Sequence, residues 1–352
     1  MPRDPMPLAL ITSTKRTTTG LDALVTEARH RSAEFPDVLA NHLPMILVAL
    51  DRMGAGPERE AAFFEAYDVG KGLVPVPPPV AGLDEASWTT VLGDRRREAD
   101  ARMFFIGEVT QRGIGNAVTT YLPRLAPGVA GSALHPLMRL AYGVLRCDPD
   151  EVGAALGYWA CCYLPLPPAG TSPPDTDDPG QVLARVAALP GLRALPAYDH
   201  LWHAIRAAAA DPDFAPAVDW LRIDETTQAR VAATALALYA ATMDFAALHA
   251  LTGAHWVRVV SQVCPDPMLL RCFWQSVAAL VPSIGFPTLP DPEQLDAMRR
   301  LPCPDWPQIM RTAIASDDEH DISLVFSASE EDKIYGDPLY RVVAARRVGL
   351  IG

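Results

Sequence analysis

Five histidines stand in apolar segments whose pattern is helical. The chain has 352 residues and eight histidines, and the five are His42, His135, His249, His255 and His320. A polar ring in an apolar segment costs free energy unless it is hydrogen-bonded or ligated. Imidazole is suited both to proton transfer near neutral pH and to binding a transition metal. We therefore expect an enzyme whose site is built from these histidines.

The spacing of His249 and His255 limits what the two rings can do together. On an unbroken helix a six-residue step turns by about 600°, which leaves the two side chains about 120° apart. They converge on one centre only if the helix is kinked or overwound, and Gly253 lies where such a distortion costs least. The alternative is that one ring contacts the reacting groups and the other supports it. Thr252 shares the face of His249 and could orient it.

His135 begins a segment with a second candidate constellation. Arg139 and Tyr142 follow at i+4 and i+7, so that one helix face offers imidazole, guanidinium and phenol. Such a face could bind an anionic or phenolic substrate. The alternative is a histidine hydrogen-bonded to the backbone, with Arg139 paired to a neighbouring carboxylate.

The other histidines could also have structural roles in place of a role in a site. His42 could be a satisfied core residue, and the acidic run 317–319 before His320 could be a solvated helix start. We expect the remaining three to lie at the surface: His30, His200 and His203. Five histidines in apolar contexts on separate segments nevertheless favour a common site over five separate structural roles.

Composition excludes several classes of partner. Hydrophobic residues make up 49% of the chain, charged residues make up 20%, and the net charge is −12. This acidity argues against nucleic acid and against an anionic membrane surface. The apolar stretches are interrupted before the roughly 18 residues of a membrane span, and the N-terminus lacks a signal-peptide pattern. We therefore expect a cytoplasmic protein with no membrane partner, and the six scattered cysteines predict core residues rather than a metal site.

Nearly every segment favours a helix, and sustained strand patterns are missing. The predicted helical ranges are 37–53, 58–67, a start at 84–88, 95–125 with interruptions at Gly113 and Gly115, 132–146, 148–163, one long helix from Asp224 past His249, 267–281, 292–300, 305–316, 317–329 and 337–347. The 34 prolines gather in connections, above all in the loop 164–180. We predict an all-α fold in which residues 1–352 form a single large domain with long proline-rich loops. Residues 1–18 are expected to be a loosely ordered N-terminal arm.

Common cofactor and nucleophile motifs are missing. The sequence has no Gly-x-Gly-x-x-Gly after a strand, no phosphate-binding Gly-x-x-x-x-Gly-Lys loop and no Gly-x-Ser-x-Gly turn. Neither the His-Glu-x-x-His motif nor the paired Glu-x-x-His motifs of a di-iron bundle are present. No organic cofactor is therefore expected.

Short motifs around the histidines resemble the questin oxidase-like family of mostly helical oxygenases. The similar segments are 41–45 with 49–55, 135–143, 249–255, 318–324 and 337–340. The resemblance spans residues from about 25 to 347. It implies oxygenation or ring opening of anthraquinones and related polyketides, by Baeyer–Villiger-like or dioxygenase chemistry. For cofactors it implies flavin-free action, NADPH dependence or a histidine-held iron. Where the family often has a lysine one turn after the closing histidine, this chain has Ser323, which argues against iron.

We expect these histidines to line an apolar pocket for a planar polyphenolic substrate that reacts with O2. A histidine base would deprotonate the phenol, and an imidazolium or Arg139 would stabilise the developing anion; Tyr142 is a further candidate. The alternative on the same substrate is a non-heme iron dioxygenase with Fe(II) held by the five histidines. A non-catalytic helical ligand-binding protein remains open. So does a metal-dependent hydrolase, for which Asp244 and Asp317 are the nearest carboxylates.

Overall fold

Aspartate residues cap the N-termini of many of the helices. The computed structural model describes residues 20–352, so the predicted arm 1–18 lies outside the described residues. An aspartate before a helix accepts hydrogen bonds from the first free backbone N–H groups. The capping residues are Asp148, Asp178, Asp244, Asp266, Asp291, Asp305 and Asp318. In four of these helices proline follows the cap directly, where its missing N–H leaves no donor unsatisfied.

The first part of the described chain forms three helices around a small hairpin. Its elements are α1 (Gly20–Arg29), β1 (Glu34–Phe35), a 3₁₀ turn (Pro36–Val38), β2 (Leu39–Ala40), α2 (Leu43–Met53) and α3 (Pro57–Lys71). The predicted helix 37–53 is therefore wrong in its first part. Asp37 and Val38 have left-handed φ angles of 70° and 61°, which turn the chain so that β1 pairs antiparallel with β2.

The second part contains two helical hairpins. Its elements are 3₁₀ turns at Trp88–Val91 and Arg95–Arg97, α4 (Glu98–Arg112), α5 (Ile114–Leu125), 3₁₀ turns at Ala126–Gly128 and Gly131–Leu134, α6 (His135–Arg146) and α7 (Pro149–Cys161). The predicted pair 132–146 and 148–163 corresponds to α6 and α7. Gly113, with φ of 78°, ends α4 and separates it from α5, as its place in the sequence indicated.

A largely irregular segment follows α7 and leads into short helices. After the proline-rich loop come α8 (Pro179–Ala187), a 3₁₀ turn (Gly191–Ala194), α9 (Leu201–Ala209) and α10 (Ala217–Trp220). Residues before and after the loop belong to one continuous hydrophobic core. The structure is therefore an all-α single domain, as predicted.

The long helix predicted from Asp224 is two helices. The elements of the C-terminal half are α11 (Thr227–Thr242), α12 (Phe245–Ser261), α13 (Pro267–Ala279), α14 (Pro292–Arg299), α15 (Trp306–Ala315), α16 (Glu319–Tyr335) and α17 (Leu339–Arg347). Met243 is left-handed, with φ of 48°, and Asp244 caps α12 through the N–H groups of Ala246 and Ala247. Because of this break, the direction of α12 is not a continuation of the direction of α11.

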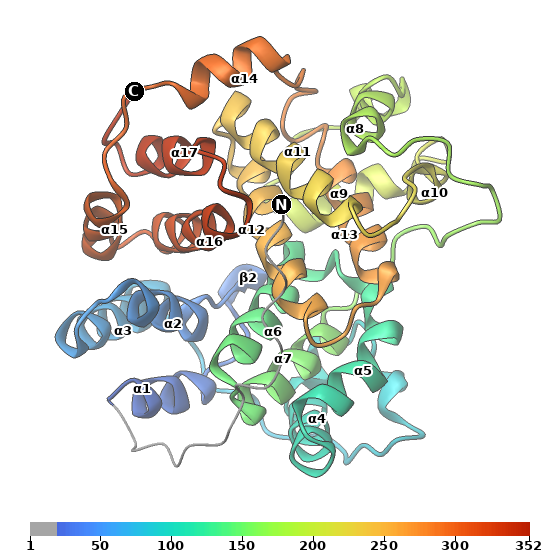
Figure 1. The fold of residues 1–352 in the computed structure, drawn as a ribbon. Helices are drawn as coiled ribbons and strands as arrows, with labels where there is room; N and C mark the ends of the chain where they lie inside the picture. The colour runs from blue at the N-terminus through green and yellow to red at the C-terminus, as the bar shows by residue number, and fades with distance from the viewer. Residues whose placement is uncertain (1–19) are drawn as a thin grey trace.

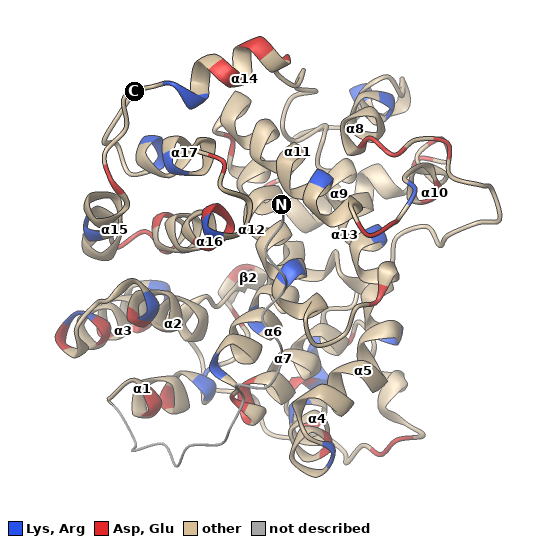
Figure 2. Cartoon of the chain, in the orientation of Figure 1, with Lys and Arg blue, Asp and Glu red and all other residues tan. Residues whose placement is uncertain are grey.

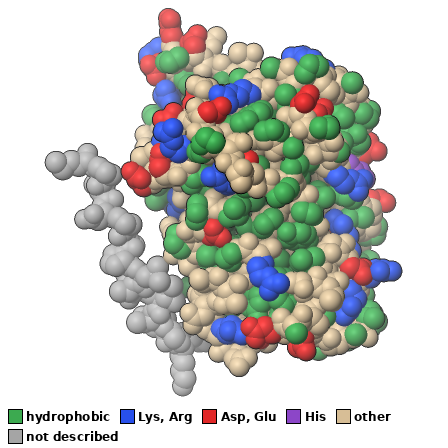
Figure 3. Space-filling view, turned by 90° about the vertical axis from the view of Figure 1, so that its right-hand side faces the viewer, with side chains coloured by type: hydrophobic (Ala, Val, Ile, Leu, Met, Phe, Trp, Pro, Cys, Tyr) green, Lys and Arg blue, Asp and Glu red, His purple; other side chains and the backbone are tan. Residues whose placement is uncertain are grey.

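Helix α12 lies at the centre of the molecule (Figure 1). It packs against α6, α11, α13 and α16, and all but three of its 17 residues are buried. Lys, Arg, Asp and Glu lie mainly on the surrounding helices and connections (Figure 2). Apolar side chains are interspersed with charged ones on the face that carries α5, α8, α10 and α13 (Figure 3). None of the described helices combines the length and apolarity needed to cross a bilayer.

Candidate functional site

A pocket of about 330 Å³ lies among four helices that are distant in sequence. Helices α2, α6, α12 and α16 pack against one another and meet near β2 (Figure 1). Each contributes one histidine to the pocket lining: His42, directly before α2, His135, His249 and His320. The structure thus brings together four of the five predicted histidines.

The rest of the wall is rich in apolar and aromatic side chains. They include Phe35, Val38, Leu39, Tyr198, Trp202 and Phe245. Leu39, Tyr198 and Phe245 are 44%, 39% and 48% exposed, so apolar surface faces solvent at this pocket. Exposed apolar side chains around a concave site are typical of ligand binding.

The ring of His42 is oriented by the chain that precedes it. Its Nδ1 lies 2.9 Å from the carbonyl oxygen of Ala40, at the end of β2. Its backbone N–H donates to the hydroxyl of Tyr67 at 3.2 Å. The hairpin and α3 therefore fix both the backbone and the ring of His42.

His135 follows a turn of unusual conformation. Ser132, Ala133 and Leu134 have consecutive φ angles of 44°, 52° and 73°, in the left-handed region that non-glycine residues rarely adopt. The turn directs the carbonyl oxygen of Ser132 to Nδ1 of His135. A β-carbon at Gly131 would lie 2.2 Å from the carbonyl oxygen of Cys162, so only glycine permits this close approach of the turn to α7.

His249 and His320 occupy the opposite side of the cluster. Nδ1 of His249 lies 2.9 Å from the carbonyl oxygen of Phe245, one turn earlier in α12. Nδ1 of His320 lies 3.1 Å from a carboxylate oxygen of its helix cap Asp318. The aromatic ring of Phe245 packs edge-on against both imidazoles, at centroid distances of 5.0 and 4.9 Å.

These contacts define which ring nitrogen is available. In all four histidines Nδ1 lies beside an oxygen acceptor, which favours the tautomer with the proton on Nδ1 and leaves Nε2 as the nitrogen available in the pocket. Burial lowers the pKa of His135 to about 4 and the pKa of His249 to about 3, and neighbouring imidazoles contribute. Burial and the other three rings also lower the pKa of His42 well below its ordinary value. At neutral pH these three rings are uncharged and present lone pairs at Nε2.

Two of these free nitrogens face one another. Nε2 of His42 lies 2.8 Å from Nε2 of His135. Two lone pairs at this distance repel unless a proton or a cation lies between them. Two imidazole nitrogens bound to one metal ion at about 2.1 Å and a right angle are about 3 Å apart, so this pair is spaced as two adjacent ligands would be.

The rings of His249 and His320 are farther from their neighbours than His42 and His135 are from each other, whose centroids are 4.5 Å apart. Ring centroids are 5.1 Å apart for His42 and His320, 5.5 Å for His135 and His249, and 6.3 Å for His249 and His320. In the described residues, the group whose ligand atoms already lie close together is Asp318, Glu319 and His320. Its carboxylates also bind basic residues, because Asp318 pairs with Arg347 and Glu319 pairs with Lys71.

His255 is the predicted site residue that the structure does not bring to the pocket. Helix α12 runs unbroken through Gly253, so the six-residue step turns His255 away from His249. Its Nδ1 lies 3.0 Å from Glu331, which also accepts from Arg258 at 2.7 Å. Gly253 serves packing instead of a kink, because a β-carbon there would lie 2.5 Å from the ring of Phe273.

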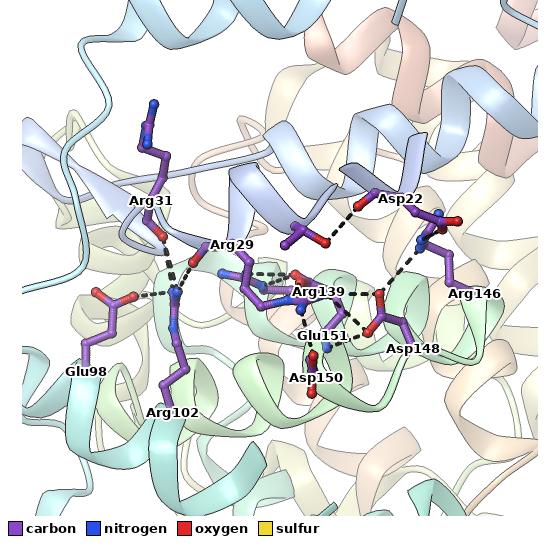
Figure 4. A network of polar contacts seen from close by, with 11 residues as sticks. Asp22, Arg29, Arg31, Glu98, Arg102, Arg139, Arg146, Asp148, Asp150 and Glu151 are labelled. Atoms are coloured by element: carbon purple, nitrogen blue, oxygen red, sulfur yellow. Dashed lines mark hydrogen bonds and ion pairs between the residues drawn. The ribbon is translucent and has the colours of Figure 1, made fainter. Parts of the chain in front are cut away.

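Arg139 also lies outside the pocket lining, in a buried ion-pair network (Figure 4). Its Nε donates to Glu151 at 2.7 Å, and Arg29 from α1 binds the other oxygen of the same carboxylate at 2.9 Å. Arg29 also pairs with Asp148 and Asp150. The network joins α1, α6 and α7. Arg139 is therefore paired to a neighbouring carboxylate, which is the structural alternative that the sequence left open.

Tyr142 is buried two turns below His135 and is not part of the pocket lining. Its hydroxyl lies beside Ser323 and Ser327 of α16, and burial raises the pKa of Tyr142. Its ring contacts Phe326 at a centroid distance of 5.7 Å. Ser323 therefore faces the helix interface with α6, and it is not among the residues that line the pocket.

Sequence reasoning missed several residues of the wall. Lys71, at the end of α3, lines the pocket and binds Glu319 at 2.8 Å. His200, expected at the surface, lines the pocket together with Trp202. Nothing in the local sequence marks these positions, because each reaches the pocket through the packing of distant segments.

Comparison with known proteins places the chain in a family. No curated protein matches the chain. The family model described as questin oxidase-like matches residues 39–327, a range that includes all four histidines of the pocket. The chain therefore belongs to the questin oxidase-like family.

Proposed function

We propose that the protein is an O2-dependent oxygenase of planar polycyclic phenols or quinones of the anthraquinone type. The observation that carries the proposal is the group of four imidazoles, each held through Nδ1, in the lining of one apolar pocket. Membership of the questin oxidase-like family supports oxidase or oxygenase chemistry. The aromatic wall supports a flat, largely apolar substrate.

An uncharged imidazole in this pocket is suited to act as a base. Burial keeps Nε2 of His249 unprotonated at neutral pH, so its lone pair is free to accept the proton of a substrate phenol. A phenolate formed beside the ring would raise the pKa of the imidazole toward the working pH, as an efficient base requires. The resulting electron-rich phenolate can itself pass an electron to O2. Lys71 takes the anion-stabilising role expected of Arg139, since it lines the pocket; its pair with Glu319 holds the ammonium at the wall and offsets part of its charge.

The same residues fit a ferrous ion as the alternative cofactor. His42 and His135 would hold it through the facing Nε2 atoms, with His249 and His320 beside them. Imidazole suits iron, and a ligating histidine whose other N–H donates to an oxygen is the usual arrangement around protein-bound metals. A ferrous ion would bind O2 and supply electrons to it. Ser323 does not weaken this fit, because its side chain lies outside the pocket wall.

The deciding experiment is turnover of a hydroxyanthraquinone by protein of known metal content. Chelation followed by iron addition separates the two versions: loss and recovery of activity supports iron, and unchanged activity of iron-free protein supports base catalysis alone. Turnover without O2 would contradict both. Tight binding without any turnover would favour the non-catalytic ligand-binding protein.

Two histidines on one helix provide a matched pair of variants. His249→Asn removes an imidazole of the pocket, whereas His255→Asn removes an equally buried imidazole outside it. We expect kcat/KM to fall by at least about 100-fold in the first variant and to stay within about threefold per folded molecule in the second. Equal losses in both would refute the assignment of the site.

The two carboxylates named for the hydrolase alternative do not support it, and Glu319, which does line the pocket, is paired with Lys71. Asp244 is committed to capping α12, and Asp317 is an exposed residue that pairs with Arg59. Neither lines the pocket of the four histidines.

A further inference from the structure

A continuous set of contacts joins the aromatic wall of the pocket to His135. The guanidinium of Arg95 lies 4.9 Å from the ring centroid of Trp202, a wall residue. Nε of Arg95 donates to Glu34 at 2.7 Å. The other carboxylate oxygen of Glu34 accepts from the hydroxyl of Ser132, and the carbonyl oxygen of Ser132 binds His135.

The residues in the middle of this path are well shielded from solvent. The side chain of Glu34 is 11% exposed, and Ser132 is buried. Arg95 also lies 3.4 Å from the hydroxyl of Ser132, so both side chains hold the same serine. A buried carboxylate that binds an arginine and a hydroxyl at once fixes the geometry of its neighbours more strongly than an exposed one.

The serine that they hold begins the strained turn. Three successive non-glycine residues with left-handed φ angles, Ser132 to Leu134, persist only where the surroundings impose them. On one side the imposing contact is the packing of Gly131 against Cys162. On the other side it is the pair formed by Glu34 and Arg95. Relaxation of this turn would move the carbonyl oxygen that orients His135.

We propose that Arg95 is a positioning residue that couples the aromatic wall at Trp202 to the orientation of His135. It acts through Glu34 and Ser132 and does not touch the substrate. A planar ligand packed against Trp202 restricts Arg95, and thereby tightens the turn and holds Nε2 of His135 toward the pocket. The part that concerns the ligand rests on the proposed function, whereas the orientation of His135 by Arg95 does not.

The test compares Arg95→Gln and Arg95→Lys with Arg31→Gln as a matched control. Arg31 also forms a partly buried ion pair, bonding Asp68 through two nitrogens at 2.9 Å each, and is not part of the pocket lining. In ¹⁵N-histidine NMR spectra without ligand, we expect the His135 ring signals to shift in Arg95→Gln. They should shift less in Arg95→Lys, which keeps the charge, and stay in place in Arg31→Gln. Unchanged His135 signals in Arg95→Gln would overturn the proposal.

Kinetics with hydroxyanthraquinone test the part of the proposal that concerns the ligand. For Arg95→Gln we expect kcat to fall about tenfold with KM within about threefold, because a misplaced reacting group slows the chemical step more than it weakens binding. Arg95→Lys should recover part of the loss. If Arg95→Gln behaves like Arg31→Gln while His249→Asn is inactive, the coupling is refuted and the proposed function stands. If no hydroxyanthraquinone binds or reacts, the proposed function fails, and the ligand-free NMR comparison still decides the positioning role.

Discussion

Acid should destabilise the metal-free protein through its buried neutral imidazoles, and His249 gives the clearest case. Its pKa in the folded protein is lowered from 6.5 to about 3, by burial and by His135 and His320. In the unfolded chain the ring has its ordinary pKa. Between about pH 6.5 and pH 3 the unfolded state therefore binds more protons than the folded state. The stability linked to this group is complete above about pH 6.5 and is lost as the pH falls toward 3.

The expected loss of stability follows from the difference between the ordinary pKa of histidine and the pH of the measurement. At pH 5 the unfolded ring is about 1.5 units below its pKa, and each unit is worth about 1.4 kcal/mol. This one group should therefore lower the free energy of unfolding by about 2 kcal/mol between pH 7 and pH 5. His249→Gln keeps an N–H donor for the carbonyl oxygen of Phe245 but cannot titrate. Its loss of stability between these pH values should be about 2 kcal/mol smaller than that of the wild type.

Urea unfolding in the presence of a chelator, at pH 7 and at pH 5, measures the difference directly. His30→Gln is the control, because the side chain of His30 is 68% exposed and lies outside the pocket; its pH dependence should match the wild type. If His249→Gln loses as much stability as the wild type between the two pH values, the ring is not held neutral in the folded state and the reasoning is refuted.

Three further substitutions test the packing around the site. His255→Asn leaves Glu331 buried with one partner fewer, and we expect unfolding measurements to show a loss of about 3 kcal/mol, with the pH profile of turnover unchanged. Gly253→Ala drives a β-carbon into the ring of Phe273, which should lower stability by about 1–3 kcal/mol; an unchanged melting temperature would contradict this packing. Arg139→Met should lower stability by about 3 kcal/mol because it leaves a buried carboxylate short of one cation, with KM for hydroxyanthraquinone unaffected.

The sequence predicted the helical elements better than their ends. Caps with a clear chemical signal, such as Asp148 before Pro149, mark the start of a helix in the structure. Met243 carries no such signal, because a left-handed methionine is a consequence of how α11 and α12 pack and not of local preference. The helix ahead of Leu43 was overpredicted for a similar reason, since the apolar spacing continues through a hairpin.

The site was predictable where it depended on residue type and helix phase. Apolar context identified the four histidines of the pocket, and the 120° step explains why His255 cannot join His249 on an unbroken helix. Lys71 and Trp202 could not be found in this way. Their place in the wall depends on the packing of α3 and α9 against segments far away in the chain.

The wide separation of the four histidines along the chain has a consequence for folding. Any cation or substrate held jointly by His42 and His320 closes a loop that contains most of the described chain. Such a bridge acts like a reversible cross-link, which raises the free energy of unfolding of the entire domain rather than of one helix. Occupancy of the pocket should therefore be measurable as resistance of the whole domain to proteolysis.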